Sequence, residues 1–188
     1  MAQTAECPPP ECGQNPQYFC DEVTDFYYAM IPSGVNQFNI YAISDLSLNV
    51  DKHFFLMSGN TLVGAKKGSS VVFEDVPYGC YRLVICTDGE VDYYCCVDLP
   101  CEHFDFGCCE LRFPFYTDLP DPVWQFGDNT GSTAHITAHE YTNLNTYPVE
   151  GTPTALIQLT WGNNNIIQNT LDFPPGIWVG MDCHDSGS

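Results

Sequence analysis

Positive charge is what this sequence has least of. The 188 residues include 5 lysines and arginines against 24 aspartates and glutamates, which gives a formal net charge of −19 at pH 7. Proteins that bind DNA or RNA neutralise phosphates with clustered lysine and arginine side chains. Lys66 and Lys67 form the one such cluster. We therefore expect no nucleic-acid partner, and an acidic, well-solvated surface.

Long apolar runs are also missing. No stretch approaches the roughly 18 to 20 apolar residues of a membrane-spanning helix. Residues 1–19 contain neither the basic nor the apolar segment of a secretory signal. We expect no membrane insertion. We also expect the protein to be synthesised in a reducing cytosol, where thiols mostly stay reduced. Removal of a signal before the first residue is the alternative.

Familiar catalytic signatures are absent as well. The sequence has no G-x-S-x-G, no H-E-x-x-H and no glycine-rich phosphate loop. Asp182, His184 and Asp185 lie close together in the sequence, but a polar tail explains them better than a site. Carboxylates are abundant, and glycoside hydrolysis would need two of them about 5 to 9 Å apart. We expect no enzymatic activity and no cofactor.

Alternation with a period near two dominates the chain from residue 35 onward. Turn residues interrupt it at intervals of 8 to 12 residues, as is typical of an all-β sandwich. The Asp88-Gly89 pair between two β-rich runs is a strong hairpin signal. The pattern predicts an antiparallel β-sandwich fold, built as one or two sandwiches. The predicted strands are residues 37–43, 53–57, 70–73, 80–86, 91–97, 134–141, 155–161 and 166–173.

The composition changes along the chain suggest three regions. Residues 1–30 are predicted to form an extended proline-rich arm, because prolines remove donors and fix φ, with a short helix over Asp21–Met30. Residues 31–105 are predicted to form a β-sandwich domain. Residues 106–188 form a second β region, either separate or part of the same sandwich. The strand at 80–86 has apolar residues on both faces, which predicts that both faces are packed against other protein segments, from this chain or another subunit.

Eleven cysteines are the most unusual feature of the composition, and five lie between residues 90 and 113. A structural zinc site usually pairs its ligands at C-x₂₋₄-C spacing, and the spacing here is different. We therefore expect no metal site. A second interpretation is that the cysteines form disulfides after release from the cell. The interpretation that we favour is that they remain reduced thiols and pack as small apolar residues, with Cys95 facing inward and Cys96 outward. The candidate zinc ligands are Cys96, Cys101, His103 and Cys109.

His135 and His139 suggest a second metal site, because residues i and i+4 share a face of a helix. However, Thr133, Ile136 and Thr137 favour a strand. On a strand the two imidazoles would lie roughly 13 Å apart, too far for one zinc ion to bind both. We expect both histidines to face solvent.

The run from Phe73 to Leu83, FEDVPYGCYRL, resembles the late-strand signature of prealbumin-like and Ig-like sandwiches. In that signature an apolar strand ends, a Pro/Gly turn follows, and a tyrosine-bearing strand returns. The longer run CYRLVICTDGEVDYYCCVDL, residues 80–99, resembles modules in structural proteins of tailed phages that infect Bacteroidetes, including crAss-like phages. The resemblance carries no catalytic residue.

The resemblance implies a non-enzymatic virion protein on the tail, neck or capsid surface, made in the host cytoplasm. Its partners would be other virion proteins and copies of itself, joined by strand addition or arm exchange. An alternative is a carbohydrate- or receptor-binding β-sandwich with a host-surface glycan as ligand. Exposure of Trp124, Trp161 or Trp178 on one concave face would favour that alternative. A metal-dependent hydrolase is the least supported interpretation.

Overall fold

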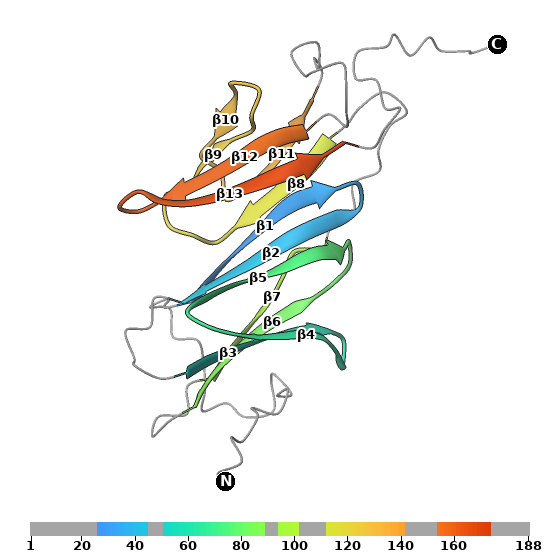
Figure 1. The fold of residues 1–188 in the computed structure, drawn as a ribbon, viewed down its shortest axis with the longest axis vertical. Helices are drawn as coiled ribbons and strands as arrows, with labels where there is room; N and C mark the ends of the chain where they lie inside the picture. The colour runs from blue at the N-terminus through green and yellow to red at the C-terminus, as the bar shows by residue number, and fades with distance from the viewer. Residues whose placement is uncertain (1–25, 45–50, 89–93, 102–111, 142–153, 174–188) are drawn as a thin grey trace, which may run out of the picture. The chain divides into compact units, whose positions relative to one another are not determined.

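The computed structural model describes residues 26–44, 51–88, 94–101, 112–141 and 154–173. These residues contain no helix and form thirteen strands in three sheets (Figure 1), which confirms the predicted all-β antiparallel sandwich class. None of them belongs to a helix long and apolar enough to cross a membrane. The strands are β1 (Phe26–Gly34), β2 (Gln37–Ser44), β3 (Asp51–Ser58), β4 (Thr61–Lys67), β5 (Ser70–Pro77), β6 (Arg82–Asp88), β7 (Tyr94–Asp98), β8 (Arg112–Thr117), β9 (Val123–Gln125), β10 (Gly131–Ser132), β11 (Ile136–Glu140), β12 (Thr154–Trp161) and β13 (Asn165–Asp172).

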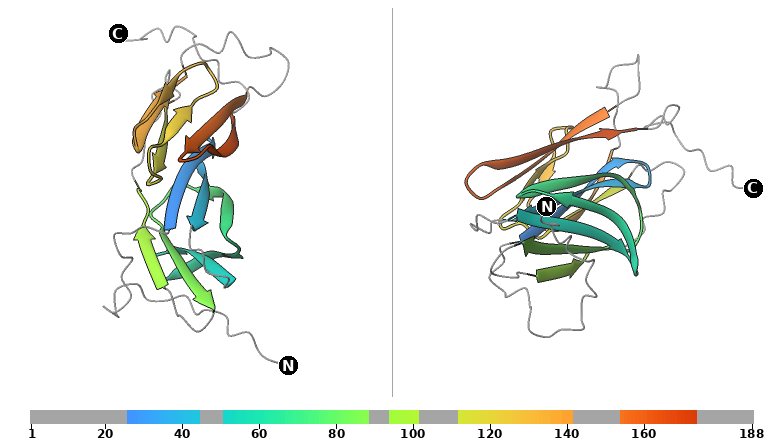
Figure 2. Two further views of the ribbon diagram at one scale, coloured as in Figure 1. Left: turned by 90° about the vertical axis from the view of Figure 1, so that its left-hand side faces the viewer. Right: turned by 60° about the horizontal axis from the view of Figure 1, so that its bottom comes forward.

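The strand orders are β11-β8-β1-β2-β5, β10-β9-β12-β13 and β4-β3-β6-β7. The chain divides into two compact units, and Figure 2 shows their strands from two further sides. The changes of unit fall inside β1, β2 and β5, between residues 78 and 79, and between residues 102 and 103. The first unit takes the described residues of Met1–Tyr28, Tyr41–Phe73 and Gly79–Glu102, and the second those of Ala29–Ile40, Glu74–Tyr78 and His103–Ser188.

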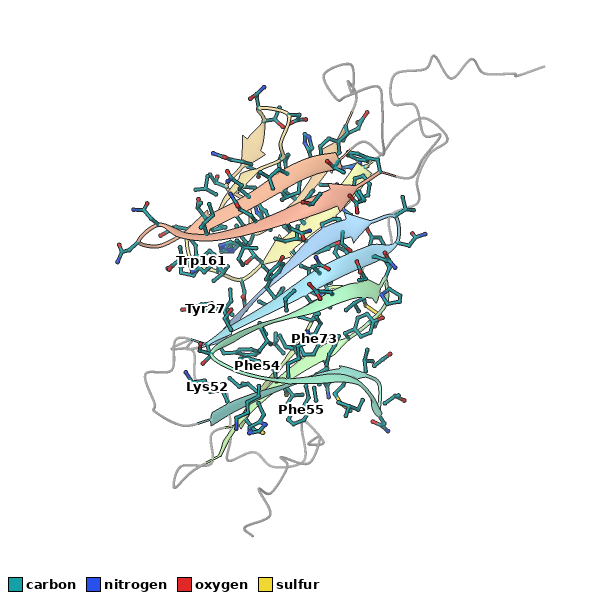
Figure 3. All side chains as sticks on the ribbon, viewed as in Figure 1. Tyr27, Lys52, Phe54, Phe55, Phe73 and Trp161 are labelled. Carbon is teal, nitrogen blue, oxygen red and sulfur yellow. A yellow bond between two sulfur atoms is a disulfide. The ribbon has the colours of Figure 1, made fainter. Side chains whose placement is uncertain are left out.

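In the first unit, both faces of the β3–β6 pair are buried. Phe54 and Phe55 are adjacent on β3 and point to opposite faces (Figure 3), as the pleat of a strand requires, and they are 0% and 7% exposed. On the β6 partner strand, Ile85 and Val84 lie opposite them in register and are fully buried. The prediction that the 80–86 strand is covered on both sides is therefore confirmed.

The core of the second unit is mainly aromatic. Phe115 lies 5.5 Å from Trp124 and 4.9 Å from Phe126 between ring centroids, and Phe113 lies 6.0 Å from Tyr141. Large apolar surfaces removed from water in this way supply most of the driving force for folding. Alternation along β12 places three more fully buried side chains on the same inner face: Ala155, Ile157 and Leu159.

A partly buried hydrogen-bond network joins strands of the second unit. The side-chain amide of Asn169 donates to the Pro32 carbonyl at 2.9 Å and accepts from Asn39 Nδ2 at 2.7 Å. Asn39 Oδ1 in turn accepts from the backbone N–H of Asp75 at 2.9 Å. Ser33 Oγ donates to Asp75 Oδ1 at 3.0 Å. Because each of these groups has a partner, the network fixes the placement of β13 without leaving a buried polar atom unsatisfied.

The predicted helix over Asp21–Met30 is wrong in the part that the structure describes. Residues 26–30, predicted as the second half of a helix, belong to β1. Residues 29 and 30 pair with Thr117 and Tyr116 of β8, and Phe26, Ala29 and Met30 are buried. Tertiary pairing of an aromatic-rich segment thus outweighs a weak helical pattern. The remainder of the predicted helix and the proline-rich arm lie outside the described residues.

Candidate functional site

The cysteines of the first unit do not all behave as predicted. Cys80 and Cys101 form a disulfide with a Cα–Cα distance of 4.6 Å, and Cys86 is also disulfide-bonded. The prediction of reduced thiols is therefore wrong for these residues. Cys96 is not part of a disulfide, and it packs against the apolar cluster that contains Phe55 instead of facing outward. Spacing along one chain could not show that Cys80 and Cys101 end up adjacent.

In the part of the chain that the structure describes, the candidate zinc ligands do not lie around a common point. The sulfur of Cys101 is bonded to Cys80, and Cys96 lies against apolar side chains. His103 and Cys109 lie outside the described residues, as do Asp182, His184 and Asp185. Within the ranges that the structure describes, no group of three or more His, Cys, Asp or Glu side chains is placed to hold a metal ion.

The two neighbouring histidines have different surroundings. His135 is exposed just before β11, as predicted. His139 lies on β11, but its side chain is only 15% exposed, so the prediction that it faces solvent is wrong. Its ring stacks on Phe126 with centroids 4.3 Å apart, and its Nε2 lies 2.7 Å from Asp128 Oδ2. The ring is held between the core and the loop that follows β9.

That loop, residues 126–130, joins β9 to β10 and is fixed at several points. The Phe126 backbone N–H donates to the Thr130 carbonyl at 3.1 Å, and the Thr130 N–H donates to Asp128 Oδ1 at 3.1 Å. Tyr141 follows the last residue of β11, and its hydroxyl donates to the Phe126 carbonyl at 2.9 Å. Side-chain bonds of an aspartate to the backbone two residues on are a common way of stabilising turns.

Gly127 is required by two features of this loop. Its φ of +82° lies in the left-handed region, where side chains are strained. A Cβ atom there would also lie 2.8 Å from the Leu156 carbonyl oxygen on β12, closer than real Cβ contacts come. The loop can therefore lie flat against β12 only with glycine at this position.

Asp128, Thr130 and His139 form the one cluster of catalytic residue types at this loop. Thr130 Oγ1 donates to Asp128 Oδ1 at 2.5 Å and lies 3.4 Å from His139 Nε2. Partial burial pushes the pKa of the Asp128 carboxyl up, but the hydrogen bonds from Thr130 and His139 outweigh it, and the pKa lies below its usual range.

The geometry of this cluster does not form a nucleophile and its base. In such a pair the hydroxyl donates to an imidazole nitrogen, and a carboxylate orients the ring from its other nitrogen. Here the Thr130 hydroxyl donates to the carboxylate, and the carboxylate contacts the same Nε2 that lies nearest the hydroxyl. The arrangement fastens the loop to β11.

Replacing Asp128 by asparagine is expected to reduce stability by about 1 kcal/mol at pH 7, because two charge-assisted hydrogen bonds are weakened. The pKa of this carboxyl is lowered on folding, so its contribution is fully present above the unfolded pKa of about 4 and is lost progressively as pH falls from there through the lower folded pKa. Urea denaturation of both proteins from pH 7 to pH 3 should show the difference shrinking with acid. Asp98→Asn, at an exposed Arg82 pair, is the control and should change little. A gap that stays constant to pH 3 would contradict the assignment.

A groove of about 840 Å³ lies between this loop and the outer face of the sheet that contains β9 and β12. Val123 and Gln125 of β9, with Leu156 and Gln158 of β12, form its floor. None of the described residues that line it carries a charge, which is unusual for a chain whose net charge is −19. The rest of the lining is Trp124, Gly127, Asn129, Thr130, Gly131, Ser132 and Thr133.

The two tryptophans that the structure describes, Trp124 and Trp161, do not form the exposed platform that a sugar site would be expected to show. Trp124 is 0% exposed, and its indole N–H donates to the Ala134 carbonyl at 3.0 Å. Trp161, at the end of β12, is partly exposed and does not line the groove. Trp178 lies outside the described residues. The contribution of Trp124 is to support the groove from beneath.

A second surface feature is the edge strand β4 of the first unit. Within the described ranges it pairs on one side only, with β3. Six of its seven residues are exposed, including Leu62 at 44% and Val63 at 47%. Lys66 and Lys67 follow on the same strand. The sequence did not predict β4, because a strand exposed on both faces shows no apolar alternation.

Comparison with known proteins adds no relative: no family model, no curated protein and no solved structure matches the chain.

Proposed function

We propose that this chain is a non-enzymatic structural protein of a tailed-phage particle, assembled on the tail, neck or capsid surface by protein–protein contacts. The phage assignment is supported by the resemblance of residues 80–99 to structural proteins of phages that infect Bacteroidetes. The all-β fold is compatible with that assignment. Its partners in this proposal are other virion proteins and copies of itself, and its place is the virion.

The observation that carries the assembly role is the exposed β4 edge. An unpaired strand edge presents a row of N–H and C=O groups that a strand of another chain can extend. Leu62 and Val63 add apolar surface to this edge, although proteins usually protect edges from pairing. The occupant that we propose is a strand from a second copy of this chain.

Charge supports a second copy as the occupant. Copies with a net charge of −19 repel one another. Lys66 and Lys67 provide the one cluster of positive charge in the sequence, so an acidic copy is repelled least at this edge. Lysines on an edge strand are also a known defence against pairing. The exposed apolar pair beside them favours the docking interpretation.

The virion assignment is tested on purified particles of the phage that encodes the chain. Quantitative mass spectrometry should find the protein at a fixed ratio to the major capsid protein across independent preparations. Immunogold labelling should place it at one position on the particle. Absence of the protein from infectious particles, or a ratio that varies freely between preparations, would overturn the assignment.

Self-association through β4 is tested by light scattering on purified protein at about 100 μM. The wild-type chain should form dimers or larger oligomers, and the double variants Leu62→Ser/Val63→Ser and Lys66→Glu/Lys67→Glu should weaken the association at least tenfold. Ile136→Ser, at an exposed apolar residue on another edge strand, is the matched control and should have no effect. A monomeric wild-type chain, or double variants that associate normally, would reject the β4 interface.

A receptor- or glycan-binding β-sandwich is the second candidate function, and the uncharged groove beside β9 favours it. The two functions are compatible, because the groove belongs to the second unit and β4 to the first.

A further inference from the structure

We infer that the groove formed by the outer faces of β9 and β12 and by the β9–β10 hairpin is a binding site for a neutral glycan. A volume of about 840 Å³ lies within the range of roughly 300–1,000 Å³ that small-ligand sites occupy. The inference concerns the groove alone and does not depend on where the protein lies in a particle.

The charge of the groove selects an uncharged ligand. A polyanion such as a sulfated or sialylated glycan would be repelled by a chain of net charge −19 and would find no lysine or arginine among the lining residues. A metal ion or a cationic ligand would find no carboxylate among the lining residues that the structure describes. The remaining ligands are neutral molecules, recognised by hydrogen bonds and apolar contacts.

The polar groups of the groove suit hydroxyl groups. Gln125 and Gln158 are direct cross-strand neighbours on the outer face, so their side chains are close enough to act on one ligand. Each amide offers two N–H donors and one carbonyl acceptor. Neither amide has a hydrogen-bond partner among the side chains and backbone that the structure describes. A sugar hydroxyl both donates and accepts, and therefore matches such a pair.

The apolar groups of the groove suit the C–H faces of a sugar ring. Val123 is 42% exposed and Leu156 is 50% exposed, and both lie on the groove floor beside the two glutamines. A purely apolar ligand would leave the glutamine amides desolvated without partners. Because no aromatic ring is exposed in the groove, we expect each site to bind weakly, with a Kd of about 0.1–1 mM.

The groove is formed before any ligand binds. Its wall is held by the Asp128–His139 and Thr130–Asp128 contacts, and Gly127 lets the loop approach β12 closely. A wall fixed in this way needs little ordering when the ligand arrives, which lowers the entropic cost of binding.

The test is an NMR titration of ¹⁵N-labelled full-length protein with neutral oligosaccharides of two to six hexose or N-acetylhexosamine units, and with sulfated counterparts of the same backbones. At least one neutral series should cause saturable shifts of residues that line the groove. Gln125→Ala and Gln158→Ala should each weaken that binding about five- to tenfold, the effect of one lost hydrogen bond. Gln168→Ala is the matched control, because Gln168 lies opposite Gln158 on β13 but does not line the groove.

Three results would overturn the inference. The first is the absence of shifts with every neutral series at 10 mM. The second is tighter binding of the sulfated counterparts than of the neutral backbones. The third is binding that Gln125→Ala and Gln158→Ala leave unchanged in variants whose spectra show an intact fold. None of these results bears on the presence of the protein in virions, so the two proposals fail separately.

Discussion

The Trp124→Ala variant is expected to unfold with a free energy about 3–5 kcal/mol below that of the wild-type chain. Trp124 is the largest of the fully buried side chains among the described residues, and its ring lies 5.5 Å from Phe115. Truncation leaves a cavity between the two sheets of the second unit. It also removes the N–H that satisfies the Ala134 carbonyl. Chemical denaturation followed by circular dichroism measures the loss.

Two further variants separate the causes of this loss. Trp124→Phe keeps most of the ring but not the indole N–H, so it should cost about 1–2 kcal/mol. Val123→Ala, one residue away on the exposed face and 42% exposed, should cost less than about 1 kcal/mol. Similar losses for Trp124→Ala and Val123→Ala would show that β9 is not packed into the core.

Loss of the Cys80–Cys101 disulfide is expected to lower stability by about 3 kcal/mol, because the bond closes a loop between residues 21 positions apart. Cys101→Ser should therefore unfold at a lower denaturant concentration than wild type under oxidising conditions. In reductant the two proteins should behave nearly alike, since the wild-type chain then also lacks the bond. Equilibrium denaturation with and without reductant measures both differences.

Cys96→Ser is the matched control for the disulfide. Cys96 is not part of a disulfide and lies half-buried against an apolar cluster, so its replacement should lower stability modestly and by the same amount with and without reductant. Mass spectrometry of the alkylated protein should identify Cys80 and Cys101 as a pair. Free thiols at both positions in the oxidised protein would contradict the structure.

The fold class was predictable because its signal is repeated. The alternation along residues 155–161 and 166–173 reappears as β12 and β13, with Gly162–Asn164 at their turn. Strands without alternation were missed. The edge strand β4 is exposed on both faces, and β10 has two residues. β1 was partly mistaken for a helix, because its pairing with β8 joins segments far apart in the sequence.

The candidate site was less predictable than the fold. His139 was placed on a strand, but nothing in the sequence shows that Asp128 meets the His139 ring. The groove depends on the register that sets Gln125 opposite Gln158. Register between strands more than thirty positions apart follows from the packing of the whole sandwich, and a local pattern does not encode it.

Each compact unit is drawn from three separate stretches of chain. No single cut in the gene therefore releases either unit intact, and a fragment that ends after residue 102 keeps β1, β2 and β5 but lacks residues 103–188 of the second unit, among them β8, which pairs with β1. N- or C-terminal fragments made for deletion mapping should consequently aggregate or be degraded by proteases, and neither should fold as an intact unit. Partner mapping on this protein calls for point variants in the full-length chain.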